Sequence, residues 1–247
     1  MIKKIISHLI WQFGYWGRIS LPQYFFAVLL PKKILSGPFS GMKYINSSTG
    51  SVVLPKLIGT YENELHNVWE SLRSKTYDNF IDVGAAEGYY AIGISKYIFK
   101  NTIPVIAFEL TKRGQNQIRK LASINNLTNI NIKGVGTPEI LEKVINHKRC
   151  FILIDVEGEE FTLLDPNIIN FSKCDILVEV HTSELINMQQ ILIKRFENTH
   201  SINIIRPQRK ELPTGTQFPN LVHKNKKYFL NEFRGQQSWL WMSANNS

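Results

Sequence analysis

The sequence predicts an open, doubly wound α/β fold built on a mostly parallel, seven-stranded sheet. From residue 79, short apolar runs alternate with stretches of helical periodicity over about 120 residues, a pattern typical of parallel strands with helices on both faces. Hydrophobic residues make up 43% of the 247 residues and charged residues 20%, which excludes disorder and supplies a large core. A glycine turn follows the first apolar run, where such sheets bind ligands.

An N-terminal extension, residues 1–60, precedes the main domain. Its first 30 residues are apolar, and a Gly/Pro/Ser-rich passage at 36–41 reads as turns. Residues 42–45 and 51–54 flank a polar turn and predict a β-hairpin.

The main domain spans residues 61–247 and opens with an amphipathic helix over 61–72. The predicted strands are 80–83, 105–108, 130–132, 151–154, 176–178, 202–205 and 238–242, and the predicted helices between them are 89–99, 112–125, 138–147, 159–164 and 184–197. Residues 206–235 break this rhythm with prolines, basic residues and aromatics. They are either a binding insertion or a disordered excursion.

The charge balance is basic, with 29 Lys and Arg against 20 Asp and Glu, a net charge of +9. Such a balance suits a phosphate-bearing substrate, nucleic acid or an anionic membrane surface. The basic residues are scattered and form no long run, so dedicated nucleic-acid binding is disfavoured. Cys150 and Cys174 stand beside apolar runs, which predicts buried reduced thiols and a cytoplasmic protein.

The apolar N-terminus has two readings. Glycines, Arg18 and Pro22 interrupt it before it reaches the ~20 residues that span a bilayer, and a signal peptide is not evident. A helix packed on the main domain is the first reading, and peripheral contact with a membrane surface is the second.

The turn after the first strand predicts a nucleotide-type cofactor. Gly84 and Gly88 permit a sharp turn into a helix that begins at Tyr89, and Glu109 ends the second strand, where an acid accepts ribose hydroxyls. The dinucleotide fingerprint and the P-loop are both absent. Asp82 and Glu87 would repel a pyrophosphate, whereas they suit the cationic groups of S-adenosylmethionine.

The motifs also resemble a known family. Asp82-Val83-Gly84-Ala85 and Phe108-Glu109 resemble class I methyltransferases, which use S-adenosylmethionine. Asp155-Val156-Glu157-Gly158-Glu159-Glu160 and Glu179-Val180-His181 resemble the FkbM-type branch of that class. The resemblance covers residues 60–205 and departs from the family pattern at Ala86, Glu87 and Leu110. It implies a methyltransferase acting on hydroxyls of small molecules or surface sugars.

The candidate site follows from the turn and the strand ends. The cofactor-binding candidates are Asp82, Gly84, Ala85, Ala86, Glu87, Gly88, Tyr89, Glu109, Leu110, Val135 and Asp155. The candidate bases are His181 first and Asp155 or Glu157 next, because a histidine titrates near neutrality. His181 is alternatively a packing or helix-capping residue. The carboxylates suit a divalent metal, but no spacing demands one, so no metal ligand is predicted.

The acceptor is predicted only by class. A small molecule or glycan precursor fits the resemblance, and the basic and aromatic residues of 206–235 are expected to form its wall. Nucleic-acid methylation and a non-catalytic cofactor-binding adaptor are the alternatives. The chain lacks the Asn/Asp-Pro-Pro-Tyr/Phe and Pro-Cys motifs of base methyltransferases.

Overall fold

The computed structural model describes residues 22–23, 25–45, 47–49, 51–156, 158–181, 186–233 and 237–245, without the side chains of residues 181, 186 and 187. The chain forms two compact units. Unit 1 comprises the chain up to Tyr61 together with Lys210–Phe233, and unit 2 comprises Glu62–Arg209 and Arg234–Ser247.

The seven-stranded sheet lies in unit 2. Its strands are β1 (Asn79–Val83), β2 (Val105–Phe108), β3 (Ile130–Lys133), β4 (Cys150–Ile154), β5 (Asp175–His181), β6 (His200–Ile205) and β7 (Gln237–Ala244). The strand order is β3-β2-β1-β4-β5-β7-β6, with β7 antiparallel to both of its neighbours and the other pairs parallel. The predicted doubly wound sheet is therefore confirmed.

Strand order reverses beside β1, because the chain first adds β2 and β3 on one side and then β4 and β5 on the other. The carboxyl ends of β1 and β4 flank this switch point. In open α/β sheets a ligand binds in the crevice that forms there.

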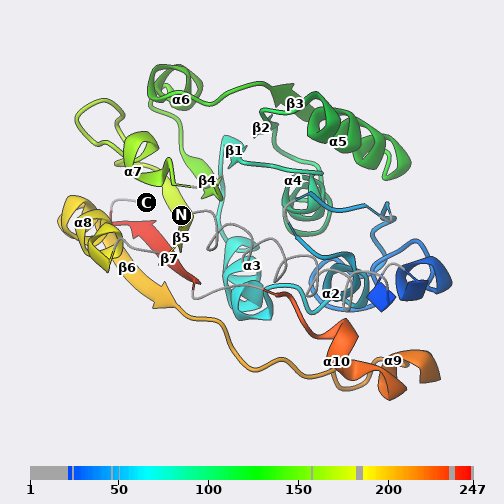
Figure 1. Ribbon diagram of the computed structural model, residues 1–247. Coiled ribbons are helices and arrows are strands. Elements are labelled where there is room, and N and C mark those ends of the chain that lie inside the picture. The colour runs from blue at the N-terminus through cyan, green and yellow to red at the C-terminus, as the bar shows by residue number, and fades with distance from the viewer. Residues whose placement is uncertain are drawn as a thin grey trace, which may run out of the picture. The chain divides into compact units, whose positions relative to one another are not determined.

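Helices cover both faces of the sheet (Figure 1). One face carries η1 (Asn63–Leu65), α3 (His66–Leu72), α4 (Tyr89–Gly93), its π-helical continuation η2 (Ile94–Ile98) and α5 (Lys112–Ile124). The other carries α6 (Pro138–Ile145), α7 (Glu160–Leu163) and α8 (Ile186–Phe196). The helix predicted over 61–72 is confirmed as η1 and α3.

The alternation of β1 assigns its side chains to the two faces. Ile81 and Val83 join the apolar core beneath α6, α7 and α8. Phe80 points the other way and stacks on Phe151, with ring centroids 5.1 Å apart, and Trp69 of α3 reaches the same ring at 6.4 Å. Because side chains two residues apart share a face, Asp82 lies on the α3 and α4 face, near the strand end.

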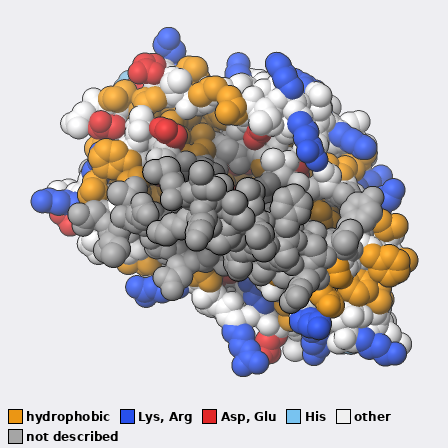
Figure 2. All heavy atoms as spheres, in the orientation of Figure 1, with side chains coloured by type: hydrophobic (Ala, Val, Ile, Leu, Met, Phe, Trp, Pro, Cys, Tyr) orange, Lys and Arg blue, Asp and Glu red, His pale blue; other side chains and the backbone are white. Residues whose placement is uncertain are grey.

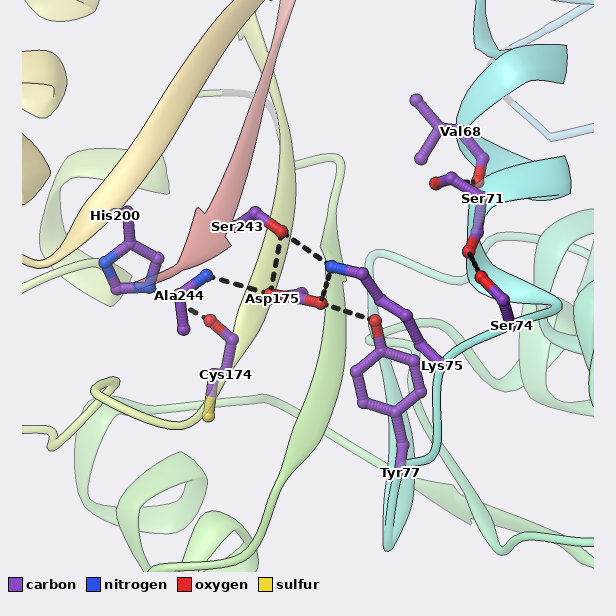
Figure 3. A network of polar contacts seen from close by, with 10 residues as sticks. All are labelled: Val68, Ser71, Ser74, Lys75, Tyr77, Cys174, Asp175, His200, Ser243 and Ala244. Carbon is purple, nitrogen blue, oxygen red and sulfur yellow. Dashed lines mark hydrogen bonds and ion pairs between the residues drawn. The ribbon is translucent and has the colours of Figure 1, made fainter. Parts of the chain in front are cut away.

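A buried polar network lies at the other end of the parallel strands, where β5 begins (Figure 3). Asp175 is 1% exposed and accepts hydrogen bonds from Lys75 Nζ at 2.6 Å and Tyr77 Oη at 2.5 Å. Ser243 Oγ and the Ala244 backbone N–H donate to its other oxygen. Burial alone would raise the pKa of Asp175, but these donors and the Lys75 charge outweigh it and lower the pKa.

The two cysteines border this network. Both are free and buried, as predicted. The Cys174 carbonyl lies 2.9 Å from His200 Nε2 at the start of β6. Burial lowers the pKa of His200, so the ring is held neutral near pH 7.

Unit 1 joins two distant parts of the sequence. Its helices are α2 (Val53–Ile58), α9 (Asn220–Lys224), α10 (Lys226–Phe229) and a helical stretch at residues 22–23 and 25–29. Gln23 donates to the Tyr228 carbonyl at 3.1 Å, and Phe26 lies 5.4 Å from Phe229 between ring centroids. Much of the predicted insertion at 206–235 thus packs with the N-terminal part of the chain.

The predicted hairpin of 42–45 with 51–54 is wrong. Residues from Val53 onward form α2, and Lys43 pairs instead with Lys33 through an isolated bridge. Leu54, Leu57 and Ile58 are fully buried at helical spacing. Pro55 lies in the first helical turn, where the missing N–H costs no intrahelical bond.

Among the described residues, no helix is both long and apolar enough to cross a membrane. Residues 1–21, on which the two readings of the N-terminus mainly rest, lie outside the described part of the chain.

Candidate cofactor and active site

The turn between β1 and α4 is built from unusual backbone angles. Gly84 and Gly88 have φ values of 87° and 94°, and Ala86 has a φ of 50°. Two backbone N–H groups, of Gly84 and Ala85, both donate to the Phe108 carbonyl at 3.0 Å. The turn is therefore held against the end of β2, and Gly88 starts α4 beside Ile118 of α5.

Asp82 is a strongly perturbed carboxyl group at this end of the sheet. It is 1% exposed, and neither carboxylate oxygen has a hydrogen-bond partner among the described residues. Burial raises its pKa to about 8, helped by the charges of Asp155, Glu109 and Glu87. The Ala91 backbone N–H acts in the opposite direction but lies outside hydrogen-bond geometry.

This environment is suited to a cation. A buried carboxyl surrounded by other carboxyl groups ionises readily only if a positive charge comes close to it. The sulfonium and the amino group of S-adenosylmethionine are such charges, so the chemistry of these residues fits that cofactor.

Glu109 lies at the end of β2, as predicted, and is 8% exposed. Its carboxylate accepts hydrogen bonds from the Ala86 N–H at 3.0 Å and from the N–H and hydroxyl of Thr111 at 2.8 and 2.5 Å. Thr111 also caps α5 by accepting from the Gly114 N–H. Glu109 thereby links the glycine turn to the start of α5, and a carboxylate has lone pairs for further donors.

The ends of β2 and β3 carry two exposed apolar side chains. Leu110 is 73% exposed and Val135 is 54% exposed. They follow adjacent parallel strands at the same edge of the sheet. Exposed apolar side chains beside a polar turn can pack against the faces of a flat aromatic group such as adenine.

The remaining cofactor candidates are enclosed. Ala85, Glu87 and Tyr89 are 6%, 0% and 6% exposed. These buried residues belong to the turn between β1 and α4 and to the first position of α4.

The structure places the three candidate bases unequally. Asp155 follows β4, is half-buried and donates its backbone N–H to the Val83 carbonyl at 3.0 Å. Asp82 and Asp155 thus end adjacent strands. Glu157 lies outside the described residues, and His181 is the last residue of β5, with its side chain outside the description.

Further polar groups lie on the same face as Asp82. Ile176, Val178 and Val180 join the opposite core, so Glu179 projects toward the α3 and α4 face, paired in register with Trp239 of β7. Glu179 is 3% exposed and Trp239 is 0% exposed. The indole Nε1 of Trp239 has no hydrogen-bond partner among the described residues.

Sequence reasoning missed Glu62 and Tyr90. Glu62 adopts a φ of 48°, is 1% exposed and accepts a hydrogen bond from the Tyr90 hydroxyl, which joins the start of η1 to α4. Its position at the start of the predicted amphipathic stretch, 61–72, was the available signal. No cluster of three or more metal-ligating side chains occurs in the described parts of the chain.

Comparison with known proteins identifies solved structures that have a similar fold. No family model and no curated protein sequence matches the chain. An rRNA methylase from Streptococcus thermophilus matches with a TM-score of 0.50 and 9% identity, over 73% of this chain and 96% of that one.

Two further methyltransferase structures share this likeness. Precorrin-6y C5,15-methyltransferase from Geobacter metallireducens GS-15 has a TM-score of 0.50 at 14% identity, covering 72% of this chain and 85% of its own. A ribosomal protein L11 methylase from Lactobacillus delbrueckii subsp. bulgaricus has a TM-score of 0.50 at 12% identity, covering 81% and 83%. With its seven-stranded sheet and these likenesses, the chain has the Rossmann-like fold of class I methyltransferases.

Proposed function

We propose that the protein is an S-adenosylmethionine-dependent methyltransferase that methylates a hydroxyl of a sugar, a surface-glycan precursor or a similar small molecule. The main support for this cofactor is the environment of Asp82. Its buried carboxyl has no hydrogen-bond partner among the described residues and stands among acidic neighbours at the switch point of the sheet. A cationic cofactor would supply the positive charge that stabilises the ionised form of this carboxyl group.

The other cofactor contacts follow from position. Glu109 binds the ribose hydroxyls with the carboxylate that already holds Ala86 and Thr111. Leu110 and Val135 would contact the adenine, and the backbone of Gly84–Gly88 would hold the methionine portion. When bound, the cofactor supplies an electrophilic methyl group on its sulfonium.

The chain's own contribution to methyl transfer is alignment and removal of a proton. Asp155 and the end of β5 lie on neighbouring parallel strands, so groups from both meet at one edge of the sheet. His181 is the proposed base that takes the proton from the acceptor hydroxyl, with Asp155 or Glu157 as the alternative. Holding the oxygen in line with the methyl group lowers the entropic cost of the reaction.

The choice of a hydroxyl acceptor rests on the FkbM-type motifs, Asp155 to Glu160 and Glu179 to His181. Methylation of nucleic acid and a cofactor-binding adaptor are the competing functions. Measurement of turnover separates the adaptor from either enzyme, and trials of sugars against RNA separate the two enzymes.

A pair of variants tests the cofactor site. Glu109→Gln should weaken binding of S-adenosylmethionine by roughly 1.5–3 kcal/mol, because it removes a charge-assisted acceptor while keeping one oxygen. Glu197→Gln, which changes an exposed glutamate after α8, is the matched control and should bind like wild type. Calorimetry that finds equal affinity in both folded variants would remove Glu109 from the site.

A further inference from the structure

A helix of unit 1 presents apolar side chains outward. Gln23, Ala27 and Leu30 form its inner stripe and are 8%, 3% and 5% exposed. Phe25, Val28 and Leu29 form the outer stripe and are 60%, 58% and 53% exposed. Positions i, i+3 and i+4 share one helical face, so these three side chains make one patch.

This patch departs from the usual design of a surface helix. Such a helix buries one apolar stripe and turns polar or charged residues to water. Here both faces are apolar, and no charged residue occurs between Arg18 and Lys32. Contiguous exposed apolar side chains mark interaction sites.

Exposed lysines occur on the segments of unit 1 that adjoin this helix. Lys32 and Lys33 follow the helix, and the bridge from Lys33 brings Lys43 alongside. The other neighbour is α10, whose Phe229 contacts Phe26. We name this set the basic apolar surface, comprising Phe25, Val28, Leu29, Lys32, Lys33, Lys43, Lys224, Lys226 and Lys227.

Figure 2 shows the two kinds of side chain together. Hydrophobic side chains are exposed where Figure 1 draws the dark-blue helix, and Lys or Arg side chains lie below them over α9 and α10. All of these elements belong to unit 1.

The charge of the protein is also divided between the units. Unit 1 carries eleven Lys and Arg and two Glu, and the first 61 residues contain no acidic residue. Unit 2 carries eighteen residues of each sign. The net charge of +9 therefore belongs entirely to unit 1.

We propose that the basic apolar surface docks on an anionic phospholipid membrane, with Phe25, Val28 and Leu29 entering the interface and the lysines contacting lipid phosphates. Both kinds of side chain favour membrane binding. Burial of the apolar side chains in the interface lowers the free energy of binding, and the negative surface potential of the membrane attracts the lysines. The protein would lie on the membrane surface without crossing the bilayer.

The apolar stripe favours a membrane over RNA. Lysines alone would suit either polyanion, because both present phosphates. RNA-binding surfaces add aromatic platforms for bases. Two of the three outward side chains here are aliphatic, and aliphatic side chains gain free energy in an acyl layer but not on a base.

Co-sedimentation of the full chain with vesicles tests the proposal. Binding is expected to vesicles of phosphatidylcholine with phosphatidylglycerol, and to be lost on phosphatidylcholine alone or at ~1 M salt, where the Debye length falls to about 3 Å. Lys224→Gln, Lys226→Gln and Lys227→Gln together should lower the partition coefficient on the order of 100-fold. Phe25→Gln, Val28→Gln and Leu29→Gln together should lower it about tenfold or more.

Matched triple variants on unit 2 control for charge and hydrophobicity. Lys120, Lys148 and Lys173 are exposed, as are Ile140, Ile168 and Ile191, and their replacement by Gln should leave vesicle binding unchanged. Circular dichroism confirms that each variant folds.

Three results would overturn the proposal: no sedimentation with anionic vesicles, an equal loss in the unit 2 controls, or unchanged binding in the folded Phe25, Val28 and Leu29 variant. Tighter binding to an RNA duplex than to vesicles, unaffected by that variant, would assign the surface to nucleic acid instead.

Discussion

Gly84 and Asp155 lie so close together that a Cβ atom on Gly84 would fall 1.9 Å from the Asp155 carbonyl oxygen. The turn after β1 and the loop after β4 are therefore in direct contact at the switch point. Gly84 also has a φ of 87°, which side-chain-bearing residues rarely adopt. The residue is required for steric and conformational reasons at once.

Gly84→Ala should disrupt the cofactor site. The clash is with backbone, which cannot rotate away, so the turn must move and with it the donors from Gly84 and Ala85 to Phe108. We expect a loss of roughly 1–3 kcal/mol of stability from the backbone strain alone, and a larger loss in affinity for S-adenosylmethionine. Thermal denaturation and calorimetry measure the two effects.

Gly215→Ala is the matched control. Gly215 has a φ of 78°, but apart from its chain neighbours no atom of the described residues lies within 4 Å of an added Cβ, so Gly215→Ala has the conformational cost without the clash. Equal cofactor affinity in the two variants would contradict the role given to the Gly84 contact.

Cofactor affinity should rise with pH because of Asp82. Its pKa is raised to about 8, so the group is mostly protonated at neutral pH and must ionise to attract a cation. Between pH 6 and 7.5 the association constant should increase by up to about tenfold per pH unit. Asp82→Asn should bind more weakly and without that slope, and a flat profile in wild type would exclude this ionisation.

Asp82 should also make the stability of the wild-type protein fall as pH rises, and Asp82→Asn should lack this fall. A carboxyl whose folded pKa lies above its unfolded value near 3.8 loses its stabilising contribution as pH rises from about 4 to 8. The free energy of unfolding of the variant, relative to wild type, should therefore improve by roughly 2–4 kcal/mol between pH 5 and 9. Urea denaturation at the two pH values measures the change; a pH-independent difference would contradict it.

The Lys75–Asp175 pair should be structural. Lys75→Met leaves a buried carboxylate with fewer donors and should cost about 2–4 kcal/mol at pH 7, a little less than a fully buried pair because Lys75 is partly exposed. Because the pKa of Asp175 is lowered in the folded protein, the carboxylate stabilises the fold at pH values above its unfolded-state pKa. This stabilisation is lost as the pH falls through its folded-state pKa. The cost of Lys75→Met should therefore shrink below pH 4.

Glu70→Gln provides the comparison for that measurement. It removes an exposed pair with Arg73 and should change the free energy of unfolding by less than about 1 kcal/mol. If Lys75→Met costs no more than Glu70→Gln, the network contributes little to the fold.

Local patterns explain why most of the sheet was predictable. The run Phe80 to Val83 is apolar except for Asp82, and residues 105–108 match β2 to the residue. β5 extends beyond the predicted 176–178 at its carboxyl end because Glu179, Val180 and His181 pair with β7. Such pairing depends on a partner more than 50 residues away.

The remaining differences are also long-range. Nothing local to residues 210–233 indicates that they pack with the first part of the chain, because their contacts with Gln23 and Phe26 cross about 200 residues. The Val-rich start of α2 read as a strand, since β-branched residues favour strands until burial at helical spacing decides otherwise. In the site, the glycine turn and Glu109 were predictable from the strand ends, whereas the Tyr90–Glu62 contact was not.

Calorimetric titration of the wild-type chain shows whether the turn after β1 binds S-adenosylmethionine. We expect saturable binding to one site, competition by S-adenosylhomocysteine, and a weaker affinity for NAD because Asp82 and Glu87 repel a pyrophosphate. Absence of binding in the folded protein, or tighter binding of NAD than of S-adenosylmethionine, would contradict the account.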